Sequence, residues 1–180
     1  MILESNRLIL RDYTENDLYT LHNFRQNTAI SKYMHWENCT LEDTNKWFQI
    51  YIEDIKRDSR MHYHFLIEDK NERVVIGETG ISIITINNKG GIGRLGFYLN
   101  PDKWGKGIIK EASIKVLDLS FNKLGLHKIT ADCESKNSRS ISTMKSLGMK
   151  QEALFRKDAF IDNEWEDIEI YSILNNEFRY

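Results

Sequence analysis

The chain has 180 residues, of which 41% are hydrophobic and 29% charged, and its formal net charge is −2. These values predict one globular domain spanning residues 1–180 rather than a disordered chain, and they give no electrostatic reason to expect nucleic acid as a partner. No signal peptide or long apolar run is visible, so a cytoplasmic protein without a membrane partner is expected. Cys39 and Cys133 have no metal or redox spacing and are expected to be reduced thiols.

The first half of the chain predicts a strand, two helices and then an antiparallel meander. Residues 6–12 alternate in the manner of a short strand. Thr14 can cap a helix, because Asp17 follows three residues later in a box-like position. Thr40 can start a second helix, because Glu42 and Asp43 follow in its first turn, where acids complement the helix dipole. Trp47, on the second of these helices, is expected to pack in the core. Three strands rich in β-branched and aromatic residues should come next, over residues 64–68, 73–87 and 92–99.

The second half predicts a helix, a strand, a helix and two strands. A helix should run from Gly107 to about residue 123 and stop at Gly125. The remaining elements are expected at residues 128–133 (strand), 138–147 (helix), about 149–161 (strand) and 164–174 (strand), with a turn at Asp162-Asn163 between the last two. This order describes a mixed α/β sheet.

Two glycine patterns invite the same interpretation, and only one has the right context. Gly91, Gly93 and Gly96 spell G-x-G-x-x-G, the dinucleotide fingerprint, which functions only where a strand ends and a helix begins. Phe97-Tyr98-Leu99 continues the strand here, so we reject that motif. Gly105 and Gly107, in contrast, stand between a strand and a helix, where exposed N–H groups and the helix dipole favour an anion such as phosphate. A glycine-rich helix start without a ligand is the alternative.

A further short motif, Asn137-Ser-Arg-Ser140, precedes the helix expected at residues 138–147. Considered alone, Asn137 or Ser138 is best interpreted as a helix cap.

Together these stretches resemble the GNAT superfamily of N-acetyltransferases, and within it the ribosomal-protein-alanine acetyltransferase branch. The matching stretches run in the family's order between residues 5 and 173 and read NRLILRDYTENDL, VVIGETGI, GRLGFYLNPDKWGKGIIKEA and KITADCESKNSRSISTMKSLGMKQEA. The resemblance implies an α/β (α+β) fold, with a mixed, mostly antiparallel central sheet flanked by helices. Two adjacent parallel strands, 92–99 and 128–133, would splay apart. It also implies acetyl-CoA as a co-substrate and no metal.

The same resemblance implies where acetyl-CoA would bind. Its pantetheine would lie between the splayed strands and pair with the backbone of Phe97, Tyr98 and Leu99. Its pyrophosphate would rest on the N–H groups of Trp104, Gly105, Lys106, Gly107, Ile108 and Ile109. Asn137 would reach the pantetheine or the thioester.

The chain departs from the family pattern at two positions. The family usually has a glutamine or arginine three residues before the first glycine of its loop, and this chain has Asp102 there. Backbone amides do most of the cofactor binding in this loop, so the departure has little effect on the expected binding of acetyl-CoA. Met144 stands seven residues after the asparagine, where many members have a tyrosine that protonates the departing thiolate. A thioether cannot donate a proton. The branch resembled here has a serine three residues after the asparagine, which is Ser140.

Acetyl transfer to an amine needs a proton acceptor, because an amine with a pKa of about 10 is mostly protonated at neutral pH. Glu78, in VVIGETGI, is our candidate base, directly or through a water, and an exposed strand carboxylate without a role is the alternative. Ser140 is the candidate acid or thiol-orienting donor. Orientation is the better-founded role, since a hydroxyl is a poor acid. Backbone N–H groups around Tyr98 could stabilise the oxyanion.

Other residues bear on the acceptor and on metals. Tyr33, His35 and Trp36 fall where this family shapes its acceptor pocket, and core packing is the alternative for Trp36. His62 and His64 can share a strand face, but no third ligand has a useful spacing, so no metal site is predicted. The last hairpin carries acids that form a solvated face or, alternatively, attract a cationic amine: Asp158, Asp162, Glu164, Glu166, Asp167 and Glu169.

Two classes of function are compatible with these residues. The first is an acetyl-CoA-dependent N-acetyltransferase that works by direct attack in a ternary complex. Its acceptor would be a protein N-terminus or a small-molecule amine such as a polyamine, an aminoglycoside or an amino sugar. The second is a CoA-binding regulatory module without turnover, which Met144 makes conceivable. The resemblance also implies that a homodimer can form.

Overall fold

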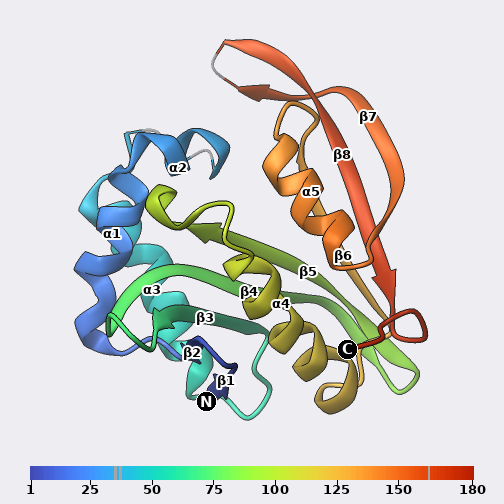
Figure 1. Cartoon of the computed structure of the whole chain (residues 1–180), viewed down its shortest axis with the longest axis horizontal. Helices are drawn as coiled ribbons and strands as arrows, with labels where there is room; N and C mark the ends of the chain where they lie inside the picture. Colours follow the sequence, from blue (N-terminus) through green and yellow to red (C-terminus); the bar gives the residue numbers. More distant parts are fainter. Residues whose placement is uncertain (35, 37, 162) are drawn as a thin grey trace.

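The computed structural model describes residues 1–34, 36, 38–161 and 163–180. The strands are β1 (Ile2–Glu4), β2 (Leu8–Arg11), β3 (His62–Asp69), β4 (Val74–Asn87), β5 (Gly90–Leu99), β6 (Lys128–Glu134), β7 (Lys150–Ile161) and β8 (Glu164–Leu174). The α-helices are α1 (Leu18–Gln26), α2 (Thr28–Met34), α3 (Leu41–Ile55), α4 (Ile108–Asp118) and α5 (Ser138–Ser146). Figure 1 shows their arrangement.

In the described part of the chain, eight strands form one sheet in the order β1-β2-β3-β4-β5-β6-β8-β7. Each neighbouring pair is antiparallel except β5 and β6, which are parallel. The predicted mixed, mostly antiparallel sheet is therefore confirmed.

Helices cover both faces of the sheet, and β3 shows how the sequence divides between them. Phe65 and Ile67 pack into the layer formed with α4 and α5, whereas Leu66, between them, packs into the layer formed with α1 and α3. All three side chains are fully buried. Successive side chains of a strand point to opposite faces, so a sheet covered on both sides needs an unbroken apolar run of this kind.

The two predicted helix starts form as expected. Thr40 Oγ1 accepts a hydrogen bond from the Asp43 N–H at 3.1 Å, and the Asp43 carboxylate accepts one from the Thr40 N–H at 3.1 Å. Thr14 and Asp17 form the same box ahead of a single 3₁₀ turn that leads into α1. Each box satisfies backbone donors that the first turn of a helix leaves unpaired.

Three features differ from the sequence predictions. The short elements β1 and α2 were not predicted. The expected core position of Trp47 is wrong, since this side chain is 54% exposed. The buried stripe of α3 runs through Thr44, Phe48 and Ile52 at a spacing of four residues, and Trp47 lies off that stripe.

The parallel strands β5 and β6 pair with each other over a short distance and then separate. Pairing covers three positions, from Ile92↔Lys128 to Arg94↔Thr130. From Leu95 to Leu99, β5 continues along β4 with no partner on its other side among the described residues. The predicted splay is thus present, and it gives the sheet an internal gap.

The rejected G-x-G-x-x-G pattern lies inside β5, as expected. A Cβ at Gly91 would approach the Thr85 carbonyl oxygen to 2.5 Å, and one at Gly93 would approach Ile81 Cγ2 to 2.6 Å. These two glycines are therefore explained by close packing within the sheet rather than by a bound phosphate.

Candidate active site

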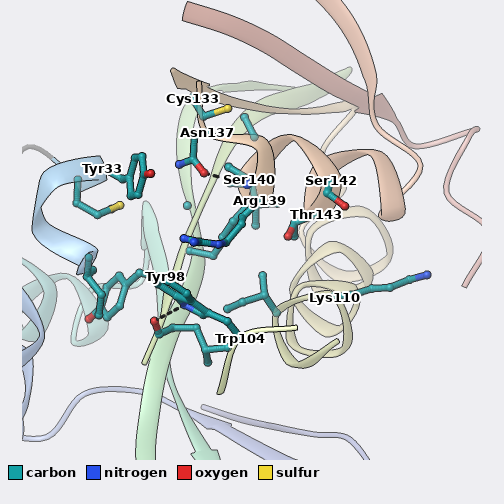
Figure 2. Close-up of a pocket in the computed structure, with 18 of the residues that line it drawn as sticks. Tyr33, Tyr98, Trp104, Lys110, Cys133, Asn137, Arg139, Ser140, Ser142 and Thr143 are labelled. Carbon is teal, nitrogen blue, oxygen red and sulfur yellow. Dashed lines mark hydrogen bonds between the residues drawn. The ribbon is translucent and has the colours of Figure 1, made fainter. Parts of the chain in front are cut away.

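A cavity of about 900 Å³ opens at the gap between β5 and β6, with α2 on one side and α5 on the other. Figure 2 shows side chains from α2, β5, the start of α4 and α5 converging on it. The predicted site residues that line it are Tyr33, Phe97, Tyr98, Leu99, Trp104, Gly105, Gly107, Ile108, Ile109, Asn137 and Ser140. Lys106, Trp36 and Glu78 do not line it, and His35 lies outside the described residues.

The start of α4 offers backbone donors to this cavity. Gly107 caps the helix in the left-handed region (φ +70°) and contributes no side-chain cap, while Gly105 also has a positive φ of +73°. The first N–H groups of a helix have no intrahelical acceptor, and the dipole makes this end positive. A Cβ at either glycine would meet no atom within 4 Å, so both positions face open space. The arrangement suits an anionic group.

Side chains around the helix start fix the loop and add positive charge. Trp104 Nε1 donates to the Leu99 carbonyl at 2.9 Å, which ties the loop to the end of β5. The Arg139 guanidinium lies 4.1 Å from the centre of the Trp104 ring, a cation–π contact visible in Figure 2. Lys106 instead turns its ammonium to the Asp102 carbonyl. The sequence analysis did not predict Arg139 as a site residue. The available signal was its position, because a cation in the first turn of a helix is unfavourable next to the positive end of the helix dipole and therefore suggests another role.

Asn137 and Ser140 meet at the start of α5. The Asn137 side-chain oxygen accepts from the Ser140 N–H at 3.1 Å, so Asn137 is a helix cap as well as a cavity residue. That bond leaves the donors of its amide nitrogen for other partners. Met144, one turn further along α5, is fully buried in the core and does not line the cavity. The position where many relatives have a tyrosine therefore contributes packing in this chain.

Cys133 also lines the cavity, beside Ser140. Burial and the neighbouring carboxylates of Glu169, Asp132 and Glu134 raise the pKa of the Cys133 thiol to about 11, against the opposite effect of the Ser140 hydroxyl. Because the thiolate is the nucleophile, this environment makes Cys133 unsuited to carry an acetyl group.

We expect Cys133 to react slowly with iodoacetamide. In a Cys39→Ser variant, where Cys133 is the remaining thiol, alkylation at pH 8 should be roughly 100-fold slower than for an unhindered cysteine, because the thiolate fraction is that much smaller. Mass spectrometry over time measures the rate, with glutathione as the reference thiol. Alkylation as fast as that of glutathione would contradict the burial of this thiol.

Arg94 and Asp132 join β5 and β6 at the point where their pairing stops. Arg94 Nε and Nη2 donate to the two Asp132 carboxylate oxygens at 2.5 and 2.6 Å. Both residues line the cavity. The pair was missed from the sequence because the two residues are 38 positions apart and meet only through the strand register.

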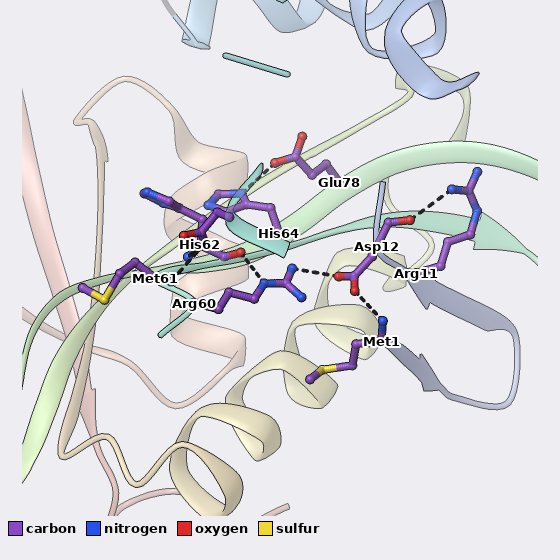
Figure 3. Close-up of polar contacts among 9 residues, drawn as sticks. Met1, Arg11, Asp12, Arg60, Met61, His62, His64 and Glu78 are labelled. Atoms are coloured by element: carbon purple, nitrogen blue, oxygen red, sulfur yellow. Dashed lines mark hydrogen bonds and ion pairs between the residues drawn. The ribbon is translucent and has the colours of Figure 1, made fainter. Parts of the chain in front are cut away.

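Glu78 is buried, with a residual exposure of 8%, so the alternative of an exposed strand carboxylate is wrong. Its carboxylate accepts a hydrogen bond from the Tyr13 hydroxyl. It accepts a second from His64 Nδ1 at 2.8 Å, and Figure 3 shows this contact. Burial by itself would raise the pKa of Glu78, but the interactions with His64, Tyr13 and Tyr98 outweigh it and leave that pKa below its ordinary value. Glu78 is therefore a weak base behind the cavity wall.

The aromatic residues near α2 divide between the cavity and the core. Tyr33 lines the cavity, whereas Trp36 packs edge-on against Tyr98 at 5.2 Å and under the Arg25 guanidinium at 4.6 Å. The core alternative for Trp36 thus describes its position. The Tyr98 hydroxyl is buried beside the Glu78 carboxylate, and burial together with that charge raises the pKa of Tyr98 well above its ordinary value.

The acids of the last hairpin are partly neutralised. Glu166 is buried and pairs with Lys136 at 2.5 Å, Asp167 lies 3.9 Å from the Lys157 ammonium, and Glu169 accepts from Tyr171. Asp162 lies outside the described residues. No three potential metal ligands come together anywhere in the described ranges. No helix among the residues described has the length and apolar character to span a bilayer.

Residues 7–150 match the acetyltransferase (GNAT) domain family. The chain therefore belongs to the GNAT family and is an N-acetyltransferase, as its resemblance implied. It is 27% identical over 179 residues to the uncharacterized N-acetyltransferase YnaD of Bacillus subtilis, covering 99% of each chain.

Two solved structures share the fold. A GNAT-family acetyltransferase from Bacillus anthracis has a TM-score of 0.81 and 26% identity, covering 98% of this chain and 100% of that one. The spermidine N-acetyltransferase of Vibrio cholerae, solved with CoA and spermine, has a TM-score of 0.83 and 23% identity, covering 96% and 98% of the two chains.

Proposed function

We propose that this chain transfers the acetyl group of acetyl-CoA to a primary amine by direct attack in a ternary complex. One observation carries the proposal: a single cavity joins the N-terminus of α4, the unpaired side of β5 and the start of α5. These three features offer an anion site, an extended hydrogen-bonding edge and small polar side chains. Those are the partners that the pyrophosphate, the pantetheine and the thioester of one acetyl-CoA molecule need.

The residues present fit acetyl-CoA as a co-substrate. The N–H groups at the start of α4, together with Arg139, would hold the pyrophosphate. The backbone of Leu95–Leu99 would pair with the amides of the pantetheine, in the manner of an added strand. Asn137 and Ser140 would orient the sulfur end. No acetyl–cysteine step is included, because Cys133 is held as a thiol.

The acceptor would enter from the side of α2, where Tyr33 lines the cavity. A protein N-terminus and a small amine both remain candidate acceptors, and the Vibrio cholerae neighbour solved with spermine supports including polyamines. Aminoglycosides and amino sugars complete the candidate amines. The competing hypothesis is a CoA-binding regulatory module without turnover, and its basis is that residue 144 is a methionine rather than a tyrosine.

A thiol-release screen separates the two. Acetyl-CoA is incubated with the protein and with single members of an amine panel: spermidine, an aminoglycoside, glucosamine and peptides with free N-termini. We expect one class of amine to release free CoA above the amine-free blank, and the acetylated amine to appear by mass spectrometry. If acetyl-CoA raises the melting temperature while no amine releases thiol, the regulatory module is the correct assignment.

A further inference from the structure

The polar network around Glu78 reaches the cavity through other residues. Glu78 does not line the cavity, but His64, which is bonded to it, does, and so does Ser82 on β4. A group that exchanges a proton with the acceptor amine must contact the cavity. His64 and Ser82 meet this condition and Glu78 does not.

The three side chains form a line of hydrogen bonds across two strands. His64 Nδ1 lies 2.8 Å from Glu78 Oε1, and His64 Nε2 lies 2.9 Å from Ser82 Oγ. A carboxylate can only accept, so the imidazole proton is on Nδ1 and Nε2 presents its lone pair to the Ser82 hydroxyl. His62 Nδ1, 3.2 Å from Ser82 Oγ, can donate to that oxygen at the same time.

The surroundings hold His64 in this orientation. The Tyr51 ring of α3 stacks on the imidazole with a centroid distance of 4.9 Å and an interplanar angle of 17°. Gly80 of β4 lies directly behind it, because a Cβ there would be 2.8 Å from His64 Cγ. Tyr13 holds the second oxygen of Glu78. The titratable groups that face His64 are therefore Glu78, His62 and Tyr51. Tyr13 does not face His64 directly, since its hydroxyl contacts Glu78.

We propose that Ser82 and His64 form the relay that takes the proton from the acceptor amine, and that Glu78 is a positioning residue for His64. The inference rests on the proposed function and moves the base from Glu78 to the histidine in front of it.

The step balances without any further reactant. The acceptor enters the step as the neutral amine, and its nitrogen forms its bond to the acetyl carbon while one of its N–H bonds breaks. That proton passes to Ser82 Oγ, and the Ser82 proton passes to His64 Nε2. The carbon–sulfur bond breaks, the thiolate takes a proton from water, and His64 returns its proton to water through the cavity.

The charge on Glu78 fits a positioning role. Its lowered pKa keeps it ionised, so a negative charge faces the imidazole when the ring becomes positive. This is the arrangement in which a buried carboxylate fixes the tautomer of a histidine base and stabilises the imidazolium. The half-buried Ser82 hydroxyl then carries the proton between the acceptor and the ring.

The relay is tested with His64→Gln, Ser82→Ala and Glu78→Gln, each measured with the best amine from the screen. We expect kcat to fall by about 100-fold or more in His64→Gln, since a general base contributes at least that factor. Glu78→Gln should also lose turnover, and Ser82→Ala should lose less because a water can bridge the gap. The acetyl-CoA Kd should be unchanged in all three.

The matched control is His127→Gln, an exposed histidine outside the cavity, which should keep wild-type kinetics. A His64→Gln enzyme that binds acetyl-CoA normally and keeps the kcat of the wild type overturns the relay. So does a Glu78→Gln enzyme with full turnover.

A second measurement separates this inference from the proposed function. If the wild type acetylates no amine, the proposed function fails, and ¹⁵N NMR of the His64 ring still decides the relay. We expect the Nδ1–H tautomer. An Nε2–H tautomer would leave the ring no lone pair towards Ser82 and would overturn the relay.

Discussion

Replacing Gly80 by alanine is expected to destabilise the protein by about 3 kcal/mol, near the upper end of the usual cost of overpacking. A Cβ there would lie 2.4 Å from the Cα of His64 and 2.6 Å from the carbonyl oxygen of Tyr63. Both are backbone atoms of β3, so relief requires the two strands to move apart. For a chain of this size the melting temperature should fall by about 6–12 °C, which calorimetry measures.

Gly96→Ala is the matched control. Gly96 is paired directly with Gly80 across β4 and β5, yet a Cβ at Gly96 would meet nothing within 4 Å. Its melting temperature should stay close to that of the wild type. A Gly80→Ala protein as stable as Gly96→Ala would show that β3 and β4 do not approach as closely as described. Because Gly80 lies behind His64, its replacement should also reduce turnover.

Replacing Gly107 by alanine is expected to weaken acetyl-CoA binding by about tenfold or more. The left-handed conformation at φ +70° costs an L-residue roughly 1–2 kcal/mol. The chain can relieve this strain by rotating the first turn of α4, and that rotation moves the N–H groups proposed to hold the pyrophosphate. A loss of about 1.4 kcal/mol in binding corresponds to a factor of ten in Kd. Isothermal titration calorimetry with acetyl-CoA measures it.

Gly125→Ala separates strain from binding. Gly125 has nearly the same φ, +67°, faces equally open space and lies outside the cavity. We expect the two variants to lose similar stability, while the Gly125 variant alone keeps its acetyl-CoA affinity. Equal affinities in the two variants would contradict the assignment of the α4 N-terminus as the phosphate site.

Features set by neighbouring residues could be predicted from the sequence. The capping box at Thr40 and Asp43 depends on two residues three positions apart. The choice between the two glycine patterns depends on whether a strand or a helix comes directly after the glycines. The residues from Trp104 to Ile109 are consecutive in the chain, and all of them except Lys106 line the cavity. In each case the controlling contacts are within about one helical turn.

Features set by distant contacts could not be predicted. The position of Trp47 depends on which stripe of α3 faces the sheet, and α2 is too short for its periodicity to stand out. The burial of Glu78 depends on Tyr13, which is 65 residues away in the chain. His64 and Ser82 meet only because β3 and β4 pair in one register, and a shift by one residue would put them on opposite faces.

The gap beside Leu95–Leu99 is an unfinished edge in the interior of a sheet. An exposed edge of this kind invites other strands to add to it and leads to aggregation. Here α2 and α5 flank the edge, and both contribute residues to the cavity that the edge lines. We propose that this enclosure protects the edge from other strands, and that the occupant suited to it is narrow, extended and able to pair with a strand.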